Sequence, residues 1–255
     1  MAFTENRHKR MPALLLALLV LILTSPALSA DTLRAGVEPW IPWIIKDKGQ
    51  FTGIAVEICQ QAVQRAGHRL VVMEIPTKRR DLVEWGRSVN IEPGCEMQWR
   101  VPQEAVSVYT EPYMETRNVI VSWKGSFPLT RQLTTFYGSL IGANTGYYYT
   151  DGLNQAFEQG LIIRDDCGSG HQLFSKLQRK RFSAIVADTL EWKYWMRELG
   201  QPIDDFQETY TFSHTNKLRI RLHRGKADLV EALNRALESM KSDHTIEAIV
   251  RRYIP

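Results

Sequence analysis

Short apolar runs that alternate with stretches of helical periodicity constrain the fold of this chain more than any other feature. The runs occupy residues 32–37, 69–75 and 89–92 in the first half of the chain and residues 139–142, 161–164 and 183–187 in the second half. Between them, apolar side chains recur at helical spacing, as in residues 55–66, where Gly67 is placed to end a helix. Apolar strands that alternate with helices are typical of parallel α/β sheets. We therefore predict two successive α/β series.

Two extended runs, residues 118–122 and 209–222, join the two series and suggest two lobes that are connected by two crossings. A helical pattern follows at residues 228–253, with a break near Asp243-His244, and is expected to return to the first lobe. The predicted fold class is α/β, with a mainly parallel sheet flanked by helices in each lobe. Lobe 1 is expected to comprise residues 31–117 and 216–255, and lobe 2 residues 118–215.

Residues 1–30 are expected to be a cleavable signal peptide. Three Lys or Arg residues among the first ten precede an apolar run at residues 14–23, and small residues follow at 26–30. The run is shorter than the ~20 residues that a transmembrane helix needs. Removal of the segment lowers the formal charge from +4 to +2, and the remaining charges are interspersed, so nucleic-acid binding has little support. We expect a soluble periplasmic protein.

The cysteines and histidines do not match a metal site. Cys59, Cys95 and Cys167 fit no zinc spacing, and the histidines form no His-x-x-x-His pair. An odd number of cysteines leaves at least one thiol without an intramolecular partner. We expect no metal and no cofactor. Two arrangements of the thiols remain open: separate semi-buried thiols, or a disulfide between Cys95 and Cys167 that closes a cleft between the lobes.

Residues 91–113 are expected to form one wall of that cleft. The stretch begins as the end of a buried strand, which we expect to break at Pro93-Gly94 before it presents Trp99 and Arg100. In open α/β sheets, ligands bind beyond the carboxyl ends of the strands. That rule points to the segment after Gly94 and to the loop at residues 38–43.

Eight segments of the chain match a known family in their order and spacing. They are LRAGVEPWIPW, FTGIAVEICQQAVQRAG, PTKR, VNIEPG, YTEPY, GANTGYYY, FSAIVAD and NRALESMKSDHTIEAI. Together they resemble family 3 of the bacterial periplasmic solute-binding proteins, which serves polar amino-acid ABC transporters. The resemblance covers essentially the whole mature chain. It implies the type II periplasmic-binding fold, with two lobes that close about a hinge over a small ligand, and no chemistry.

The resemblance implies a pair of residues that bind the two ends of an amino acid. Arg100 matches the arginine that binds the α-carboxylate, for which a guanidinium offers a planar, bidentate fork. The alternative is a surface ion pair with Glu96 or Glu104. Glu96 departs from the family's hydroxyl-rich loop and is expected to neutralise Arg100 or to face a cationic part of the ligand. Asp188 matches the second-lobe carboxylate that binds the α-amino group, with a helix N-cap as its alternative role.

Five further positions are implied by the same resemblance. Trp40 matches an aromatic lid, and Glu38 matches the acidic position beside it; the alternatives are an indole in the core and a carboxylate in solvent. Thr145 and Gly146 match a loop whose backbone N–H groups point at the ligand carboxylate. Tyr147 is then expected to line the cleft.

The function that follows is that of a monomeric binding protein for a small polar solute of the amino-acid class. It would close about its hinge and deliver the solute to the membrane permease of an ABC transporter. Glu38 and Glu96 favour a cationic or zwitterionic solute. Two alternatives remain open: an exported enzyme like the cyclohexadienyl dehydratases, with Glu38, Glu96 or Cys95 as its acid, or a subunit that presents the solute to a membrane sensor.

Overall fold

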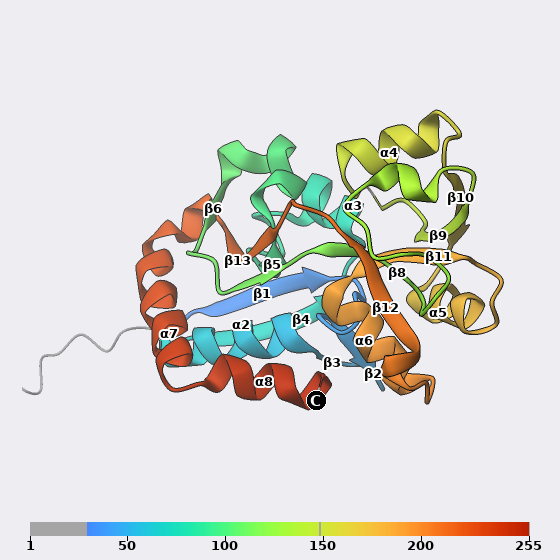
Figure 1. Cartoon of the computed structure of the whole chain (residues 1–255). Helices are drawn as coiled ribbons and strands as arrows, with labels where there is room; N and C mark the ends of the chain where they lie inside the picture. The colour runs from blue at the N-terminus through green and yellow to red at the C-terminus, as the bar shows by residue number, and fades with distance from the viewer. Residues whose placement is uncertain (1–29, 148, 255) are drawn as a thin grey trace, which may run out of the picture.

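The computed structural model describes residues 30–147 and 149–254. The predicted signal peptide therefore lies outside the described residues except for Ala30, and Tyr148 lies outside them as well. The described chain forms two β-sheets, which lie side by side and are flanked by helices (Figure 1).

The first sheet has the strand order β4-β1-β5-β13-β6, and β7 pairs with β13 beyond this path. The bounds are Thr32–Val37 for β1, Arg69–Glu74 for β4, Ile91–Cys95 for β5, Ser107–Tyr109 for β6, Met114–Thr116 for β7 and Asn216–His223 for β13. Strands β4, β1 and β5 are parallel, and β13 is antiparallel to β5, β6 and β7. A separate hairpin joins β2, Ile45–Asp47, to β3, Gln50–Thr52.

The second sheet repeats this arrangement with the order β10-β9-β11-β8-β12. The bounds are Asn118–Trp123 for β8, Leu140–Asn144 for β9, Ile163–Cys167 for β10, Ala184–Asp188 for β11 and Phe206–Thr211 for β12. Strands β10, β9 and β11 are parallel, whereas β8 is antiparallel to β11 and β12. In both sheets the parallel strands come from the predicted α/β series, and the antiparallel ones adjoin the crossings between the sheets.

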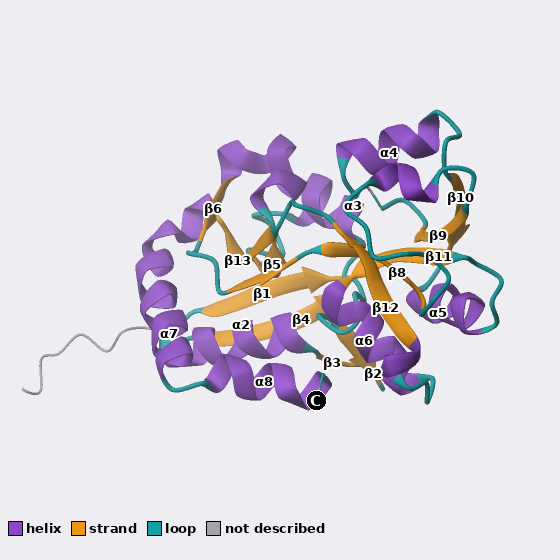
Figure 2. Cartoon of the chain, in the orientation of Figure 1, coloured by secondary structure: helices purple, strands orange, loops and turns teal. Residues whose placement is uncertain are grey.

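Helices cover both sheets (Figure 2). The α-helices are α2 (Ile54–Arg65), α3 (Thr77–Arg79), α4 (Asp151–Glu158), α5 (Gly170–Gln178), α6 (Thr189–Glu198), α7 (Val230–Ser242) and α8 (Thr245–Tyr253). A π-helical turn follows α3 at Arg80–Glu84, and 3₁₀ helices lie at Met97–Val106, Leu133–Phe136, Ile203–Asp205 and Arg224–Leu229. Apolar residues of α2, α7 and α8 share one core with the first sheet, as predicted for the C-terminal helices. Two further cores pack on the second sheet.

Three predicted segments can be compared directly with the structure. The helical pattern at residues 228–253 is confirmed, and its break falls at His244, which adopts a left-handed conformation with φ 60° between α7 and α8. The extended run at residues 209–222 is divided, because the chain leaves β12 and crosses between the sheets before β13. The sequence pattern also predicts a helix over residues 147–159, but α4 begins only at Asp151, where the Thr150 hydroxyl caps it by accepting from the Leu153 amide.

The predicted break at Pro93-Gly94 is also wrong, because β5 continues through both residues to Cys95. Pro93 lies where the pairing of β5 with β13 shifts register, between the positions of Arg219 and Arg221. Proline has no N–H group to donate, and it is tolerated at such irregularities of a sheet. Sequence alone suggested a loop here, whereas the structure contains an irregular buried strand.

Gly94 is required by close packing behind the strand. A Cβ atom at this position would lie 2.9 Å from the Tyr113 hydroxyl oxygen and 3.0 Å from the Ala55 Cβ. The Tyr113 hydroxyl itself donates to the Pro93 carbonyl oxygen at 3.0 Å. The backbone of β5 is thereby held against α2 and against the chain that leads toward the crossings.

The two crossings lie side by side between the sheets. Arg117 separates β7 from β8, and residues 212–215 separate β12 from β13. The Arg117 guanidinium donates to the Thr215 hydroxyl at 3.3 Å, and the Arg117 carbonyl accepts from the Thr189 amide at 3.0 Å. The start of α6 is therefore anchored to the crossing itself.

Candidate functional site

A cavity of about 560 Å³ lies between the two sheets and is lined by residues from both. The first half and the C-terminal part of the chain contribute Glu38, Pro39, Trp40, Ile44, Thr77, Arg80, Glu92, Gly94, Trp99, Arg100 and Asn216; the intervening part contributes Asn118, Thr145, Gly146, Tyr147, Tyr149, Asp188 and Glu191. Most of these residues belong to the carboxyl ends of parallel strands or to the segments that follow them, where ligands of open α/β sheets bind. The volume is within the range of small-molecule sites, ~300–1,000 Å³.

One wall of the cavity is formed by an arginine cluster, which consists of Arg80, Arg100 and Arg221 together with Asp81 and Glu92. Glu92 is only 3% exposed and lies 2.7 Å from Arg100, 2.9 Å from Arg80 and 3.1 Å from Arg221. Asp81 lies 3.0–3.3 Å from the same arginines. Three guanidinium groups thus share two carboxylates, which leaves one positive charge in excess.

The carboxylates of the arginine cluster are held in their charged form. Burial opposes the ionisation of Glu92, but the surrounding arginines outweigh it and hold the pKa below its usual value. The pKa of Asp81 is also lowered, because Arg80, Arg100 and Arg221 outweigh its burial. The excess charge of +1 therefore persists at neutral pH, at a wall that faces the cavity.

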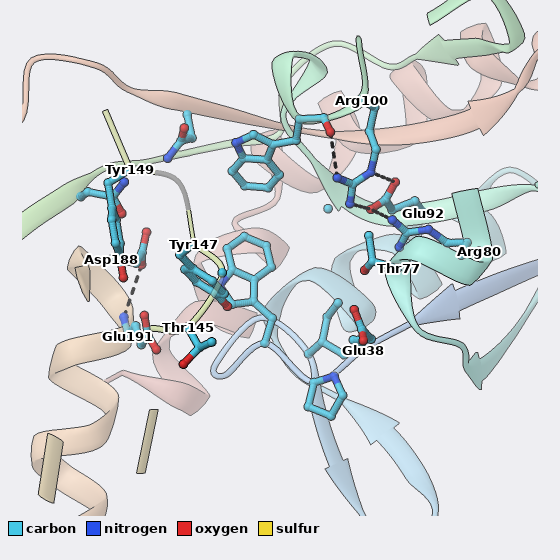
Figure 3. Close-up of a pocket in the computed structure, with 18 residues that line it drawn as sticks. Glu38, Thr77, Arg80, Glu92, Arg100, Thr145, Tyr147, Tyr149, Asp188 and Glu191 are labelled. Carbon is cyan, nitrogen blue, oxygen red and sulfur yellow. Dashed lines mark hydrogen bonds and ion pairs between the residues drawn. The ribbon is translucent and has the colours of Figure 1, made fainter. Parts of the chain in front are cut away.

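Arg100 is part of this wall, as predicted, but its partners differ from those that the sequence suggested. It pairs with Glu92 and Asp81 and not with Glu96 or Glu104, and it also donates to the Trp99 carbonyl oxygen at 3.0 Å. In Figure 3, Arg100 and Arg80 converge on Glu92 on one side of the cavity. Arg80, Asp81, Glu92 and Arg221 were not identified from the sequence. The signal that was available is Glu92, a charged residue inside an otherwise apolar strand.

The opposite wall carries two buried acids, Asp188 and Glu191, at the junction of β11 and α6 (Figure 3). Asp188 is 6% exposed and caps α6: its Oδ1 accepts from the amides of Leu190 at 2.9 Å and Glu191 at 3.3 Å. The Thr116 hydroxyl, in β7, donates to its other oxygen. The N-cap role is thus present, and the same side chain lines the cavity.

Both acids have strongly perturbed pKa values. Burial raises the pKa of Asp188 to about 7, against the opposing effect of the two helix amides. Burial and the nearby charge of Asp188 raise the pKa of Glu191 to about 8. Neither acid has a Lys or Arg partner among the described residues. This wall therefore changes its charge near neutral pH, whereas the arginine cluster does not.

Glu38 and Trp40, the two residues of the first loop that the sequence suggested, line the cavity. Trp40 stacks on Trp43, with ring centroids 5.3 Å apart, and meets the edge of Trp99 at 5.6 Å. Trp43 is fully buried, whereas Trp40 is partly exposed and Glu38 is exposed. The indole of Trp40 thus both packs on the core and forms part of the cavity surface.

The loop after β9 brings Thr145, Gly146 and Tyr147 to the cavity. The Thr145 amide donates to the Cys167 carbonyl oxygen at 2.9 Å, so it is already used within the lobe. The Gly146 amide makes no hydrogen bond to the described residues. Of the two amides that the sequence suggested for anion binding, that of Thr145 is therefore occupied within its own lobe. Gly146 has φ 77°, a conformation that favours glycine.

Glu96 does not line the cavity, which corrects the expectation that it faces the ligand or neutralises Arg100. Its carboxylate accepts from the Met97 amide at 2.9 Å and from the Lys217 amide, so it caps a 3₁₀ helix and fixes the start of β13. Cys59, Cys95 and Cys167 are buried, free thiols and do not line the cavity either. The disulfide considered between Cys95 and Cys167 is not formed in this structure.

Among residues 30–147 and 149–254, no three or more His, Cys, Asp and Glu side chains are grouped so that they could hold a metal ion. In the same part of the chain, no helix combines the length and the apolar character needed to cross a membrane.

Comparison with known proteins identifies the same family over nearly the whole described chain. The family model described as bacterial extracellular solute-binding proteins, family 3, matches residues 33–255. The L-cystine-binding protein TcyJ of Escherichia coli K12 is 25% identical over 228 residues, which cover 87% of this chain and 82% of that protein.

Solved structures share the fold of this chain. An ancestral cationic amino acid solute-binding protein has a TM-score of 0.71 at 17% identity, with 88% of this chain and 96% of that chain covered. The unliganded, open L-cystine solute receptor of Neisseria gonorrhoeae has a TM-score of 0.66 at 16% identity, with 88% and 92% covered. At these identities the likeness concerns the fold, which is the two-lobed α/β fold of periplasmic amino-acid-binding proteins. The chain belongs to family 3 of the bacterial extracellular solute-binding proteins.

Proposed function

We propose that this chain is an exported, periplasmic binding protein that captures an amino acid or an amino-acid-like solute and delivers it to an ABC transporter. The observation that carries this proposal is the chemistry of the two walls of the cavity: one wall has an excess of positive charge, and the other carries two acids that become negative when they ionise. One wall has the arginine cluster with its excess of +1, and the other has Asp188 and Glu191. A solute with a carboxylate at one end and an ammonium group at the other complements both walls.

The carboxylate of the solute is assigned to the Arg100 side. Arg100 forms part of the cavity surface, whereas Arg221 is fully buried behind it. A guanidinium that already holds Glu92 can still donate a further N–H to a ligand oxygen, because each arginine has five donors. The excess charge of the arginine cluster makes that contact favourable although Glu92 and Asp81 are nearby.

The ammonium group is assigned to Asp188. A cation next to this carboxylate favours its ionised form and offsets the cost of its burial. Trp40 and Tyr147 provide aromatic surfaces at the cavity, which suit the apolar or cationic part of a solute. The relatives whose names specify L-cystine or cationic amino acids bind solutes of this zwitterionic kind, and this supports the assignment.

Hinge closure provides the coupling between capture and delivery in this proposal. The cavity needs both lobes, and two crossings connect them at Arg117 and residues 212–215. A solute favours the closed form only through contacts that the open form lacks. Contacts with Arg100 on one lobe and Asp188 on the other meet this condition.

The enzyme alternative receives less support than binding. Of the three candidate acids, Cys95 and Glu96 do not line the cavity, and the Glu96 carboxylate is held by two backbone amides. Glu38 lines the cavity but is exposed. The three acids that the sequence suggested for catalysis therefore do not converge in the cavity.

A thermal-shift screen of the purified protein against L-amino acids, with L-cystine, L-ornithine and L-citrulline added, tests the proposal. Ligand that binds only the folded state raises its stability by about 2.7 kcal/mol at a concentration of one hundred times Kd. At least one of these solutes is expected to raise the melting temperature, and calorimetry then gives its Kd. If no solute produces a shift, the amino-acid assignment is refuted.

A further inference from the structure

Glu191 differs from a usual acid in the first turn of a helix. Such an acid interacts with the helix dipole and normally remains in solvent. Glu191 is instead 5% exposed, and the exposure that it keeps is toward the cavity that it lines. A carboxyl group that is buried in this way requires a partner or a proton.

The described residues do not provide a charged partner for Glu191. Its Oε1 lies 3.5 Å from the Asn144 side-chain nitrogen, at the limit of a hydrogen bond, and the other group that favours its ionised form is the backbone N–H of Asp188. The charged group that acts on Glu191 is Asp188, which repels a second negative charge. When both acids are ionised, the empty cavity wall is therefore unfavourable.

The surroundings of Tyr147 show how these charges are distributed in the cavity. The carboxylates of Glu191, Glu38 and Asp188 all act on the Tyr147 hydroxyl and, together with its burial, raise its pKa. Three carboxylates that line the cavity thus act on one phenol hydroxyl, two from the α6 side and one from the first loop. Aromatic faces and carboxylates together suit an ammonium or guanidinium group.

We propose that Glu191 is a ligand-binding residue that holds, jointly with Asp188, a cationic nitrogen group of the solute. The inference rests on the proposed function and extends it, because it assigns an additional specificity-determining residue and a charge to the ligand. The solute carries an ammonium or guanidinium group with several N–H donors, which bridges the two carboxylates. Neutral solutes of the same size bind more weakly, because they gain no charge–charge interaction with the two acids.

Protonation gives this subsite a second measurable property. With pKa values of about 7 for Asp188 and about 8 for Glu191, the empty pair holds protons at neutral pH. A cation between the two carboxylates favours their ionised forms, so binding releases protons. Thr116, Trp43 and Glu208 act on Asp188, Asn144 acts on Glu191, and Tyr147 lies under the influence of both acids; no Lys or Arg among the described residues pairs with either acid.

The test compares Glu191→Gln with wild type and with Glu198→Gln, a matched change at the exposed end of the same helix. Gln keeps the size of the side chain and its contact with Asn144 but removes the charge. The probes are L-arginine, L-lysine, L-cystine, putrescine and L-citrulline, which keeps the α-amino and α-carboxyl groups of arginine but has an uncharged side chain. Calorimetry in phosphate and in Tris gives Kd and the number of protons released in each case.

The proposal expects at least one cationic probe to bind wild type and to bind Glu191→Gln about ten- to hundredfold more weakly, the usual effect of losing a charge-assisted hydrogen bond. Proton release should decrease in Glu191→Gln, while Glu198→Gln should behave as wild type. If an amino acid binds and Glu191→Gln changes neither Kd nor proton release, the inference is overturned and the proposed function stands. If only putrescine binds, and does so through Glu191, the amino-acid function is overturned and the cation subsite stands. If no cationic probe binds but another L-amino acid does, only the inference is overturned; if no L-amino acid binds, both are overturned.

Discussion

Arg100 provides the sharpest test of how the cavity binds a carboxylate. The arginine cluster has three guanidinium groups and two carboxylates, so its excess charge is +1. Replacement of Arg100 by Ala reduces that excess to zero. A ligand carboxylate would then face a neutral wall, although Arg80 would remain at the cavity surface.

The size of the expected loss of affinity follows from the charge that Arg100→Ala removes. Two unit charges ~4 Å apart interact with about 4 kcal/mol at the effective dielectric constant of ~20 that suits partly buried sites. Truncation of one partner of a buried, hydrogen-bonded charge pair typically costs about 2–5 kcal/mol. We therefore expect Arg100→Ala to raise Kd by roughly 30- to 5,000-fold. Arg100→Lys keeps the charge but loses the planar fork, so its effect should be smaller.

Arg100→Ala should have only a limited effect on folding, so a loss of ligand binding can be distinguished from a loss of stability. Glu92 loses one of its three partners in Arg100→Ala but keeps Arg80 and Arg221. It therefore remains a buried carboxylate with counter-charges, and the melting temperature should fall only modestly.

Titration calorimetry with the amino acid that gives the largest shift in the thermal screen measures Kd. Arg251→Ala is the control, because Arg251 is exposed on α8 and remote from the cavity. Unchanged affinity for an acidic or zwitterionic ligand in Arg100→Ala, with the protein still folded, would refute the assignment of the carboxylate to this wall.

Two further predictions concern the empty protein. Between pH ~4 and ~8, the folded state retains protons on Asp188 and Glu191 that the unfolded chain has lost. The free energy of unfolding should therefore fall as the pH rises through that window, by an amount of the order of a few kcal/mol. This fall should be smaller in Glu191→Gln, which lacks one of the two acids. Melting temperatures of wild type and variant across this pH range check the prediction, and parallel curves would contradict it. Gly94→Ala should destabilise the fold by about 1–3 kcal/mol, because the added Cβ would lie 2.9 Å from the Tyr113 hydroxyl oxygen and 3.0 Å from the Ala55 Cβ. Chemical denaturation measures this change, and an unaltered midpoint would mean that β5 shifts without cost.

The sequence by itself determined most of the architecture. Apolar strands that alternate with helical periodicity predicted two α/β series, and the break near His244 marked the boundary between α7 and α8. These features depend on local periodicity and on turn chemistry, which are readable along the chain. Local signals misled at Pro93-Gly94, because the packing of β5 against β13 and Tyr113 accommodates a proline and requires a glycine inside a strand.

Part of the site could also be predicted from the sequence, because ligands of open α/β sheets bind beyond the carboxyl ends of the strands. Arg100, Asp188 and Tyr147 all line the cavity, because each follows or ends a strand of a parallel set. That rule selects positions but does not give the partners of the side chains found there. It could not indicate that the Glu96 carboxylate turns toward the Lys217 amide, 121 positions along the chain.

Only the tertiary structure decided the charge of the two walls. Arg221, on β13, reaches Glu92 on β5 and Asp81 after α3, and no short-range pattern connects these three residues. Burial then determines which groups keep their charge: Glu92 stays ionised among three arginines, whereas Glu191, equally buried but without a cation, holds a proton at neutral pH. The physical reason is that solvation and electrostatic partners depend on what surrounds a side chain in space, and residues far apart in the sequence supply those surroundings.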